Sequence, residues 1–167
     1  MVIYMKYLIF SDSHRATLGM RSVITRCIDG LDGVIFLGDH YDDTEFIAAE
    51  LPELTLHAVA GNCDISSKYL APEYREKILC LDGVRVLITH GHGHGVKWGL
   101  GPIEQYARAK GVDAVLFGHT HERVERYSDG LYIFNPGSVS QPRDGTPSFG
   151  VLTVQDGQIL LSHGNVY

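Results

Sequence analysis

Tyr7–His14, YLIFSDSH, joins a short apolar run to an abrupt polar end. The apolar part is too short for a helix and rich in strand-favouring residues, so it predicts a strand buried on both faces. In open α/β sheets, functional residues lie just beyond the carboxyl ends of such strands. Asp12 and His14 stand two positions apart, and in an extended segment such side chains point the same way. A carboxylate and an imidazole aimed at one point predict the start of a metal site.

The same combination recurs at four later points of the chain. Each is an apolar, strand-like run that ends in glycine together with Asp, Asn or His. Five such ends are unlikely to arise by chance, and we expect them to meet at one edge of the fold. The four later strands are predicted at Val34–Leu37, Thr55–Ala60, Val84–Thr89 and Ala114–Phe117, and they end in GDHYDD, GNCD, THGHGHG and GHTH.

The remaining pattern changes from alternating strands and helices to a strand-rich second half. Helical spacing predicts helices over 20–28, 44–51 and 101–110. Short antiparallel strands are expected afterwards, and the turn pairs Asp82-Gly83, Asp129-Gly130 and Asp156-Gly157 join neighbouring strands as hairpins. This order predicts an α/β fold, a two-layer β-sandwich core flanked by helices. The expected strands are Glu76–Leu81, Arg123–Tyr127, Leu131–Phe134, Phe149–Val154 and Gln158–His163.

Length and composition narrow the class of protein. A chain of 167 residues with 44% apolar and 20% charged residues suits a single domain, expected over 1–167. The net charge of -6 without a basic tract argues against a stable nucleic-acid partner, although bound metals could still attract a small phosphate substrate. No run approaches the ~20 apolar residues of a membrane span. Met1–Phe10 is expected to be a first strand rather than a signal peptide.

Cysteine use and surface aromatics give two further expectations. Three widely spaced cysteines form neither a disulfide framework nor a thiolate zinc site, which favours a reduced, cytoplasmic setting. Trp98 and Tyr167 could contribute to a homo-oligomer interface. The cysteines are Cys27, Cys63 and Cys80.

The five polar ends together supply carboxylate, amide and imidazole donors without thiolate. This donor set suits Mn, Fe, Co, Ni or Zn, and it exceeds the needs of one ion. Two divalent ions sharing one carboxylate fit the number of donors. Such pairs clamp the attacking and leaving oxygens of an in-line phosphoryl displacement and lower the pKa of a bridging water. With a bridging hydroxide, a charge of about +1 would remain to hold an anionic phosphate ester. The donors are Asp12, His14, Asp39, Asn62, His90, His119 and His121.

In this order, the motifs D-x-H, G-D, G-N, T-H-G and G-H-x-H resemble the calcineurin-like metallophosphoesterase superfamily. Gly61–Asp64 and the run Asn135–Arg143 are similar to its small YfcE-type phosphodiesterase branch. The resemblance covers nearly the whole chain. It implies that Asp39 bridges two metal ions, with manganese the first expectation. It also assigns a first ion to Asp12, His14 and His121 and a second to Asn62, His90 and His119.

At Cys63 the chain departs from many relatives of the wider superfamily, which carry histidine there, although cysteine is usual in the YfcE-type branch. A thiol is a weaker donor than an imidazole, so we expect slow catalysis on poor leaving groups or a substitute donor such as His92. Cys63 itself either takes part in catalysis or fills the wall of the site. Asp64 either orients a ligand imidazole or caps its own turn, while Asn62, His92 and Arg143 are candidates for contact with substrate. His40, His57, His94 and His163 are expected to be non-ligands.

The leading hypothesis is a metal-dependent phosphodiesterase in which a metal-bridging hydroxide attacks phosphorus. A phosphomonoesterase or nucleotide hydrolase would use the same site and differ in pocket size. A third hypothesis follows from a retromer subunit that resembles the family, keeps the fold and binds proteins with an impaired metal site. Every expected ligand is present here, which favours the enzyme over the scaffold.

Overall fold

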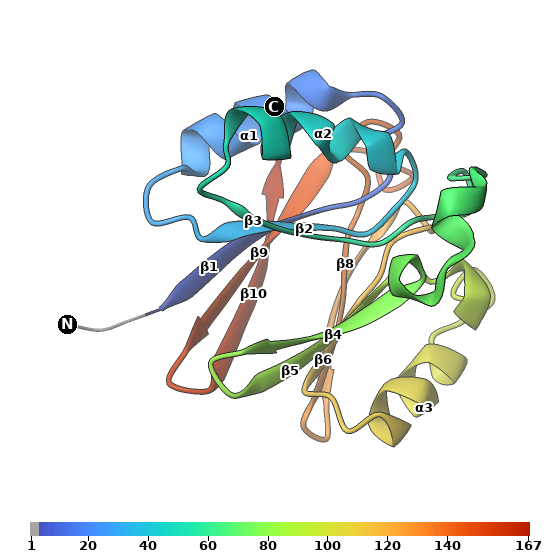
Figure 1. The fold of residues 1–167 in the computed structure, drawn as a ribbon. Helices are drawn as coiled ribbons and strands as arrows, with labels where there is room; N and C mark the ends of the chain where they lie inside the picture. The colour runs from blue at the N-terminus through green and yellow to red at the C-terminus, as the bar shows by residue number, and fades with distance from the viewer. Residues whose placement is uncertain (1–3) are drawn as a thin grey trace.

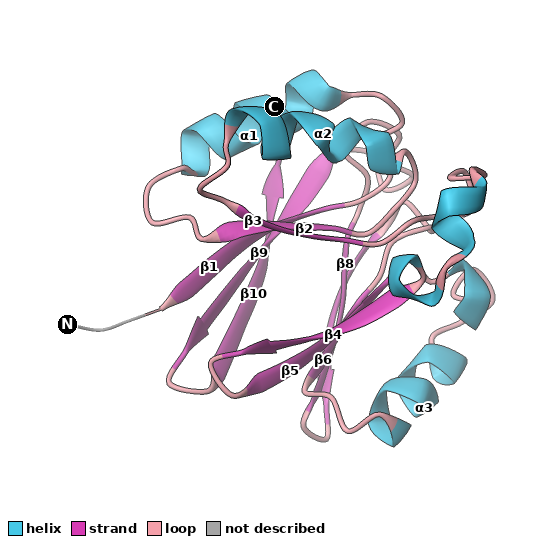
Figure 2. Cartoon of the chain, in the orientation of Figure 1, coloured by secondary structure: helices cyan, strands magenta, loops and turns pink. Residues whose placement is uncertain are grey.

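The computed structural model describes residues 4–167, so the first three residues of the expected strand Met1–Phe10 lie outside it. The described part forms two five-stranded sheets that face each other, with α-helices on their outer faces (Figure 1, Figure 2). The α-helices are α1 (Thr17–Cys27), α2 (Glu45–Glu50) and α3 (Gly101–Ala109). Short 3-10 helices lie at η1 (Tyr41–Thr44), η2 (Ser67–Leu70), η3 (Pro72–Tyr74) and η4 (His92–His94). This architecture confirms the predicted α/β sandwich.

The first sheet has the order β10-β9-β1-β2-β3. Strands β1, β2 and β3, from the first part of the chain, pair in parallel. The C-terminal hairpin adds β9, which is antiparallel to β1, and β10, which is antiparallel to β9. Parallel neighbours place their carboxyl ends at one edge, so the loops after β1, β2 and β3 leave the sheet together. The strands are β1 (Met5–Phe10), β2 (Gly33–Phe36), β3 (Thr55–Ala58), β9 (Ser148–Gln155) and β10 (Gln158–Asn165).

The second sheet has the order β4-β5-β6-β8-β7. The β7–β8 hairpin is antiparallel as expected, but β8 also pairs in parallel with β6, with Ala114 opposite Tyr132, which the sequence pattern does not predict. The β7–β8 hairpin folds back so that β8 lies next to β6 and leaves β7 at the edge. The strands are β4 (Glu76–Leu81), β5 (Val84–Thr89), β6 (Ala114–Leu116), β7 (Arg123–Ser128) and β8 (Leu131–Pro136).

Strand β1 shows how the layers are held together. Tyr7 and Ile9 pack into the core between the two sheets, whereas Leu8 and Phe10 pack toward the outer helices. All four side chains are buried, which confirms a strand covered on both faces. On the outer side α1 contributes Met20, Val23 and Ile24, whose spacing of three and four places them on one helix face.

The described helices and turns agree with two further sequence patterns. Within residues 4–167 no helix combines the length and the apolar character needed to cross a bilayer. The three Asp-Gly pairs form the hairpin turns β4–β5, β7–β8 and β9–β10, with positive φ at both residues of each turn.

Candidate metal centre

The candidate ligands lie in loops that follow five strands, contributed by both sheets. Asp12 and His14 follow β1, Asp39 follows β2 and Asn62 follows β3. In the second sheet, His90 follows β5, and the next loop, after β6, carries two further histidines. The two sheets therefore deliver their polar strand ends to one place. The two histidines after β6 are His119 and His121.

The backbone of these loops is left-handed at most of the candidate ligands. Asp12 and His14 have φ values of 54° and 43°, so their shared direction does not come from an extended segment as we had expected. His119 and His121, which are also two positions apart, are left-handed as well, with φ values of 68° and 60°. Left-handed residues cost roughly 1–2 kcal/mol each, and such strain is concentrated at functional sites. The sharp turns direct consecutive polar side chains inward.

Two glycines are required by close approach to the carboxylates. A Cβ atom at Gly61 would lie 2.2 Å from Asp39 Oδ1, and one at Gly118 would lie 1.9 Å from Ser11 Oγ. Real Cβ atoms do not approach other atoms so closely, and the backbone of each loop is held against its neighbour. The glycines of the G-N and G-H motifs therefore make room for the acidic side chains.

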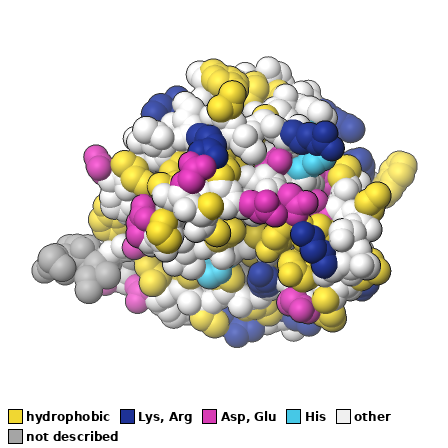
Figure 3. All heavy atoms as spheres, turned by 45° about the horizontal axis from the view of Figure 1, so that its top comes forward, with side chains coloured by type: hydrophobic (Ala, Val, Ile, Leu, Met, Phe, Trp, Pro, Cys, Tyr) yellow, Lys and Arg dark blue, Asp and Glu magenta, His cyan; other side chains and the backbone are white. Residues whose placement is uncertain are grey.

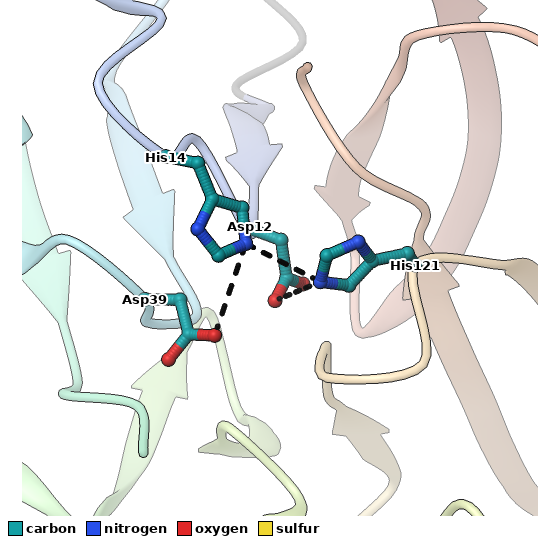
Figure 4. Close-up of side chains that lie close together, drawn as sticks. All are labelled: Asp12, His14, Asp39 and His121. Carbon is teal, nitrogen blue, oxygen red and sulfur yellow. Dashed lines mark hydrogen bonds and ion pairs between the residues drawn. The ribbon is translucent and has the colours of Figure 1, made fainter. Parts of the chain in front are cut away.

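A first group of four residues has the spacing of a metal site. Asp12, His14, Asp39 and His121 each offer one ligand atom, and these atoms lie within 4.8 Å of one another (Figure 4). His121 Nε2 lies 3.1 Å from Asp12 Oδ1 and 3.3 Å from His14 Nε2. His14 Nε2 lies 3.9 Å from Asp39 Oδ2.

A second group lies on the other side of Asp39. His90 Nε2 is 3.1 Å from Asn62 Oδ1 and 3.4 Å from Asp39 Oδ1. The His119 ring lies 5.1 Å from the His90 ring, measured between centroids. One carboxylate oxygen of Asp39 thus faces His14 and the other faces His90. Asp39 stands between the two groups.

Hydrogen bonds fix which imidazole nitrogen faces the site. His90 Nδ1 donates to the Leu37 carbonyl at 2.7 Å, and His121 Nδ1 donates to the Gln141 carbonyl at 2.8 Å. A carbonyl can only accept, so both Nδ1 atoms carry protons and both neutral rings turn an Nε2 lone pair inward. Such contacts commonly orient metal-binding histidines.

Most of the side-chain atoms that point into the centre are hydrogen-bond acceptors, and they face other acceptors. Such an arrangement fits a bound cation. Asp12 is completely buried, and its Oδ1 has no hydrogen-bond partner among the described residues although His121 Nε2 is close. His90 Nε2 faces the side-chain oxygen of Asn62 in the same way. Buried acceptors without donors are costly, and a divalent cation would satisfy them together. The residues present fit a metal.

The electrostatics favour neutral imidazoles at His14 and His119 but not at His121. Burial lowers the pKa of His14, and burial with the neighbouring His90 lowers the pKa of His119 to about 4. Burial opposes ionisation of Asp12, but His121, His90 and Ser11 outweigh it and hold the pKa of Asp12 below its ordinary value. The Asp12 contact in turn raises the pKa of His121. A proton on His121 and a cation at Asp12 would therefore compete for one place.

The other predicted site residues lie around this centre. The His92 ring is 5.4 Å from the His90 ring and 6.0 Å from the His119 ring, at the edge of the second group. Cys63 is exposed, but partial desolvation and the nearby Asp39 carboxylate raise the pKa of its thiol to about 11, so it carries no thiolate near neutral pH. The Arg143 backbone N–H donates to the His121 carbonyl at 2.9 Å.

Asp64 takes the role of a turn cap. Its carboxylate accepts hydrogen bonds from the backbone N–H groups of Gly61 at 2.7 Å and Tyr41 at 2.8 Å. The described contacts include no imidazole, so they support the capping alternative rather than the orientation of a ligand. The bonds tie the loop after β3 to the loop after β2.

The loop around Asn135-Pro136-Gly137-Ser138 supports the site from behind. Ser138 Oγ donates to the Asp12 carbonyl at 2.8 Å, and Ser140 Oγ donates to the Ser13 carbonyl at 2.9 Å. The residue pattern leaves two alternatives for this run, a plain turn or a loop against the metal ligands, and the contacts with the loop after β1 support the second. The contacts of Ser138 and Ser140 bridge more than 100 positions of the chain, and the Gln141 carbonyl meets His121 across 20 positions, so no local pattern reveals them.

Comparison with known proteins agrees with this geometry. Residues 5–157 match the calcineurin-like phosphoesterase superfamily domain. The chain is 33% identical to the probable metallophosphoesterase YsnB of Bacillus subtilis, covering 91% of this chain and 86% of that protein. It is 29% identical to the phosphodiesterase MJ0936 of Methanocaldococcus jannaschii, covering 90% and 94%.

Solved structures share the fold. A conserved protein of Streptococcus pneumoniae, described as a predicted phosphoesterase, superposes with a TM-score of 0.78 at 21% identity over 99% of this chain and 92% of that one. Vacuolar Protein Sorting 29 of Cryptosporidium parvum gives a TM-score of 0.72 at 18% identity, covering 96% and 97%. The match to the family domain over most of the chain, together with the relative in Bacillus, places this protein in the calcineurin-like phosphoesterase superfamily.

Proposed function

We propose that this protein hydrolyses phosphate esters, with a preference for diesters, as a single domain that uses two divalent metal ions. Asp12, His14 and His121 would hold the first ion, and Asn62, His90 and His119 the second. Asp39 would contact both. The observation that carries the proposal is the position of Asp39, whose two oxygens face His14 at 3.9 Å and His90 at 3.4 Å.

The metal ions and the protein residues would have different roles in hydrolysis. When bound, divalent ions supply Lewis acidity, activating water and neutralising the charge that develops on the phosphate. The chain holds the acids and imidazoles in place through the Leu37 and Gln141 carbonyls. Manganese is our first expectation, with Ni, Fe, Co and Zn as alternatives that nitrogen and oxygen donors also suit.

Other side chains would contact the ester. His92 stands at the exposed edge of the second group and can donate a ring N–H to a substrate oxygen. The Arg143 guanidinium, close enough to His121 to affect its pKa, can hold a non-bridging phosphate oxygen. Cys63 is exposed and un-ionised near neutral pH, so we assign it to the wall of the site rather than to nucleophilic attack.

The preference for diesters rests on space beside the ligands. A pocket of about 560 Å³ adjoins Asn62 and His92, which leaves room for a second organic group on phosphorus. A diester carries two organic groups and a monoester only one, so room beside the ligands favours the diester and the monoester alternative is second. The partner we infer is therefore a small phosphate ester.

The cysteines and the surface side chains bear on the cellular compartment and on self-association. Three free cysteines support a reduced, cytoplasmic setting. On the face drawn in Figure 3, basic side chains are interspersed with acidic and apolar ones, as suits a small substrate rather than a polyanion. Trp98 and Tyr167 are 94% and 80% exposed, and self-association through them remains a prediction.

The experiment compares Asp39→Asn with wild type for hydrolysis of bis(4-nitrophenyl) phosphate in manganese, with bound metal measured in parallel. We expect kcat/KM to fall roughly 100-fold or more and metal content to drop, because the amide carries no charge to share between ions. Asp113→Asn is the matched control, since that carboxylate caps the Arg85 N–H at the opposite end of β5. Full activity of Asp39→Asn with metal retained would refute the assignment. Metal-loaded wild type inert toward mono- and diesters would favour the protein-binding scaffold.

A further inference from the structure

The pocket beside the second ligand group has two unlike walls. Asn62 and His92 form the side toward the candidate metal centre. The opposite side comes from residues 65–75, a stretch before β4 that includes η2 and η3. Its volume of about 560 Å³ is in the range of small-molecule sites. The residues of the opposite wall that matter here are Ile65, Tyr69, Leu70, Tyr74 and Arg75.

The opposite wall is apolar and aromatic. Ile65 is 90% exposed and Leu70 is 64% exposed, although both line the pocket. Behind them the rings of Tyr41, Tyr69 and Tyr74 contact one another with centroids 5.0–5.5 Å apart. Exposed apolar side chains gathered around a pocket indicate a ligand-binding surface, and supporting rings make that surface rigid. This wall suits a flat or apolar group.

The charges of the pocket leave one cation without a partner. The Asp64 carboxylate is occupied by backbone N–H groups, and Glu76 accepts a hydrogen bond from the Tyr106 hydroxyl and lies 3.6 Å from His94 Nε2. The Arg75 guanidinium makes no hydrogen bond or ion pair with any described residue. Its backbone is used instead, with the N–H donating to the Pro72 carbonyl and the carbonyl accepting from Thr89 Oγ1. A guanidinium fork with free donors matches an anionic group such as phosphate.

We propose, on the basis of the phosphodiesterase function above, that this pocket holds one organic group of the substrate and that this group joins a flat ring to a second anion. The ring would lie against Leu70, Ile65 and the tyrosines, and the anion would bind Arg75. A nucleoside that carries a further phosphate has this chemistry. The substrate class is therefore a nucleotide-like phosphodiester rather than a simple alkyl or aryl diester.

Three substrates that release the same 4-nitrophenolate test this proposal. They are methyl 4-nitrophenyl phosphate, thymidine 5′-(4-nitrophenyl phosphate) and the same thymidine compound with a 3′-phosphate. In wild type we expect kcat/KM to rise along the series, by about tenfold for the added 3′-phosphate, the size of a charge-assisted hydrogen bond. Arg75→Gln should remove that last gain and leave the first two substrates unchanged. Leu70→Ser should reduce the gain from the thymidine ring.

Arg26→Gln is the control, because this arginine lies in the last turn of α1 and donates to the Asn165 carbonyl, outside the residues that line the pocket. No advantage of the 3′-phosphate in wild type, or an equal loss on all three substrates in Arg75→Gln, would overturn the proposal. Inactivity of wild type even on the methyl ester would instead count against hydrolysis itself. In that case calorimetric binding of thymidine 3′,5′-bisphosphate to wild type and Arg75→Gln decides, and equal affinities would overturn the pocket assignment.

Discussion

The two ends of the β-sandwich use the same backbone conformation for opposite purposes. At the hairpin end, Asp82, Asp129 and Asp156 are left-handed, exposed and each followed by glycine. At the other end, Asp12 and Asp39 are also left-handed, but they are 0% and 3% exposed. Aspartate tolerates this conformation better than most residues, which explains its presence at both ends.

What differs is where the carboxylate goes. At the hairpin end it is in water, and the turn needs only its backbone. At the site end it is buried against imidazoles from the other sheet, with His121 Nε2 at 3.1 Å from Asp12. A left-handed aspartate therefore indicates function only when its side chain is taken out of water and left short of donors.

Substituting the aspartates should give the largest difference in activity between the two ends of the sandwich. Asp12→Asn should reduce kcat/KM on bis(4-nitrophenyl) phosphate roughly 100-fold or more, since the amide lacks the negative charge with which this carboxylate would hold a divalent cation. Asp129→Asn should leave activity unchanged, because asparagine also tolerates the left-handed turn. Steady-state kinetics with manganese measures both. Equal effects of the two substitutions would remove the distinction between the ends.

Glycine substitutions at the two ends of the sandwich should also differ in their effect, although less than the carboxylate substitutions. Gly61→Ala places a Cβ atom 2.2 Å from Asp39 Oδ1, whereas a Cβ atom at Gly157 meets nothing within 4 Å. We expect Gly61→Ala to weaken manganese binding about 10- to 100-fold, the range for disturbed support of a ligand. Gly157→Ala should only lower stability, by about 1–2 kcal/mol for its positive φ. Calorimetric titration and thermal melting distinguish the two. Unchanged manganese affinity in Gly61→Ala would contradict the close approach.

Removing metal should give the smallest and most local change. At 100 times the dissociation constant a bound ligand stabilises a fold by about 2.7 kcal/mol, so chelation should lower Tm by roughly 5–10 °C in a chain of this size. Hydrogen exchange should quicken at the His119 N–H, which donates to Asp12 Oδ2, and stay constant in the hairpins. A uniform change along the chain would argue that metal does not act at the loops.

Much of the fold and most of the candidate ligands could be predicted from local sequence patterns. Burial of Tyr7–Phe10 on both faces of the sheet follows from its continuous apolar run, and the Asp-Gly turns follow from local backbone preference. The candidate ligands could be identified because each follows a strand-like run that ends in polar residues. The left-handed φ at His14 could not, because it depends on packing between loops far apart in sequence. The same holds for the parallel pairing of β8 with β6 and for the wall around Tyr74, whose segment has no periodic pattern.

The two sheets contribute different chemistry to the centre. The first sheet brings Asp12, Asp39 and Asn62 together with His14, and the second brings only imidazoles, from His90, His119 and His121. A relative slide of one layer over the other would pull oxygen donors away from nitrogen donors. Ile9, Leu116 and Leu152 pack in the core between the sheets, and this packing therefore also keeps the ligands of the two sheets together. Any ion that binds would in turn stabilise the contact between the two layers.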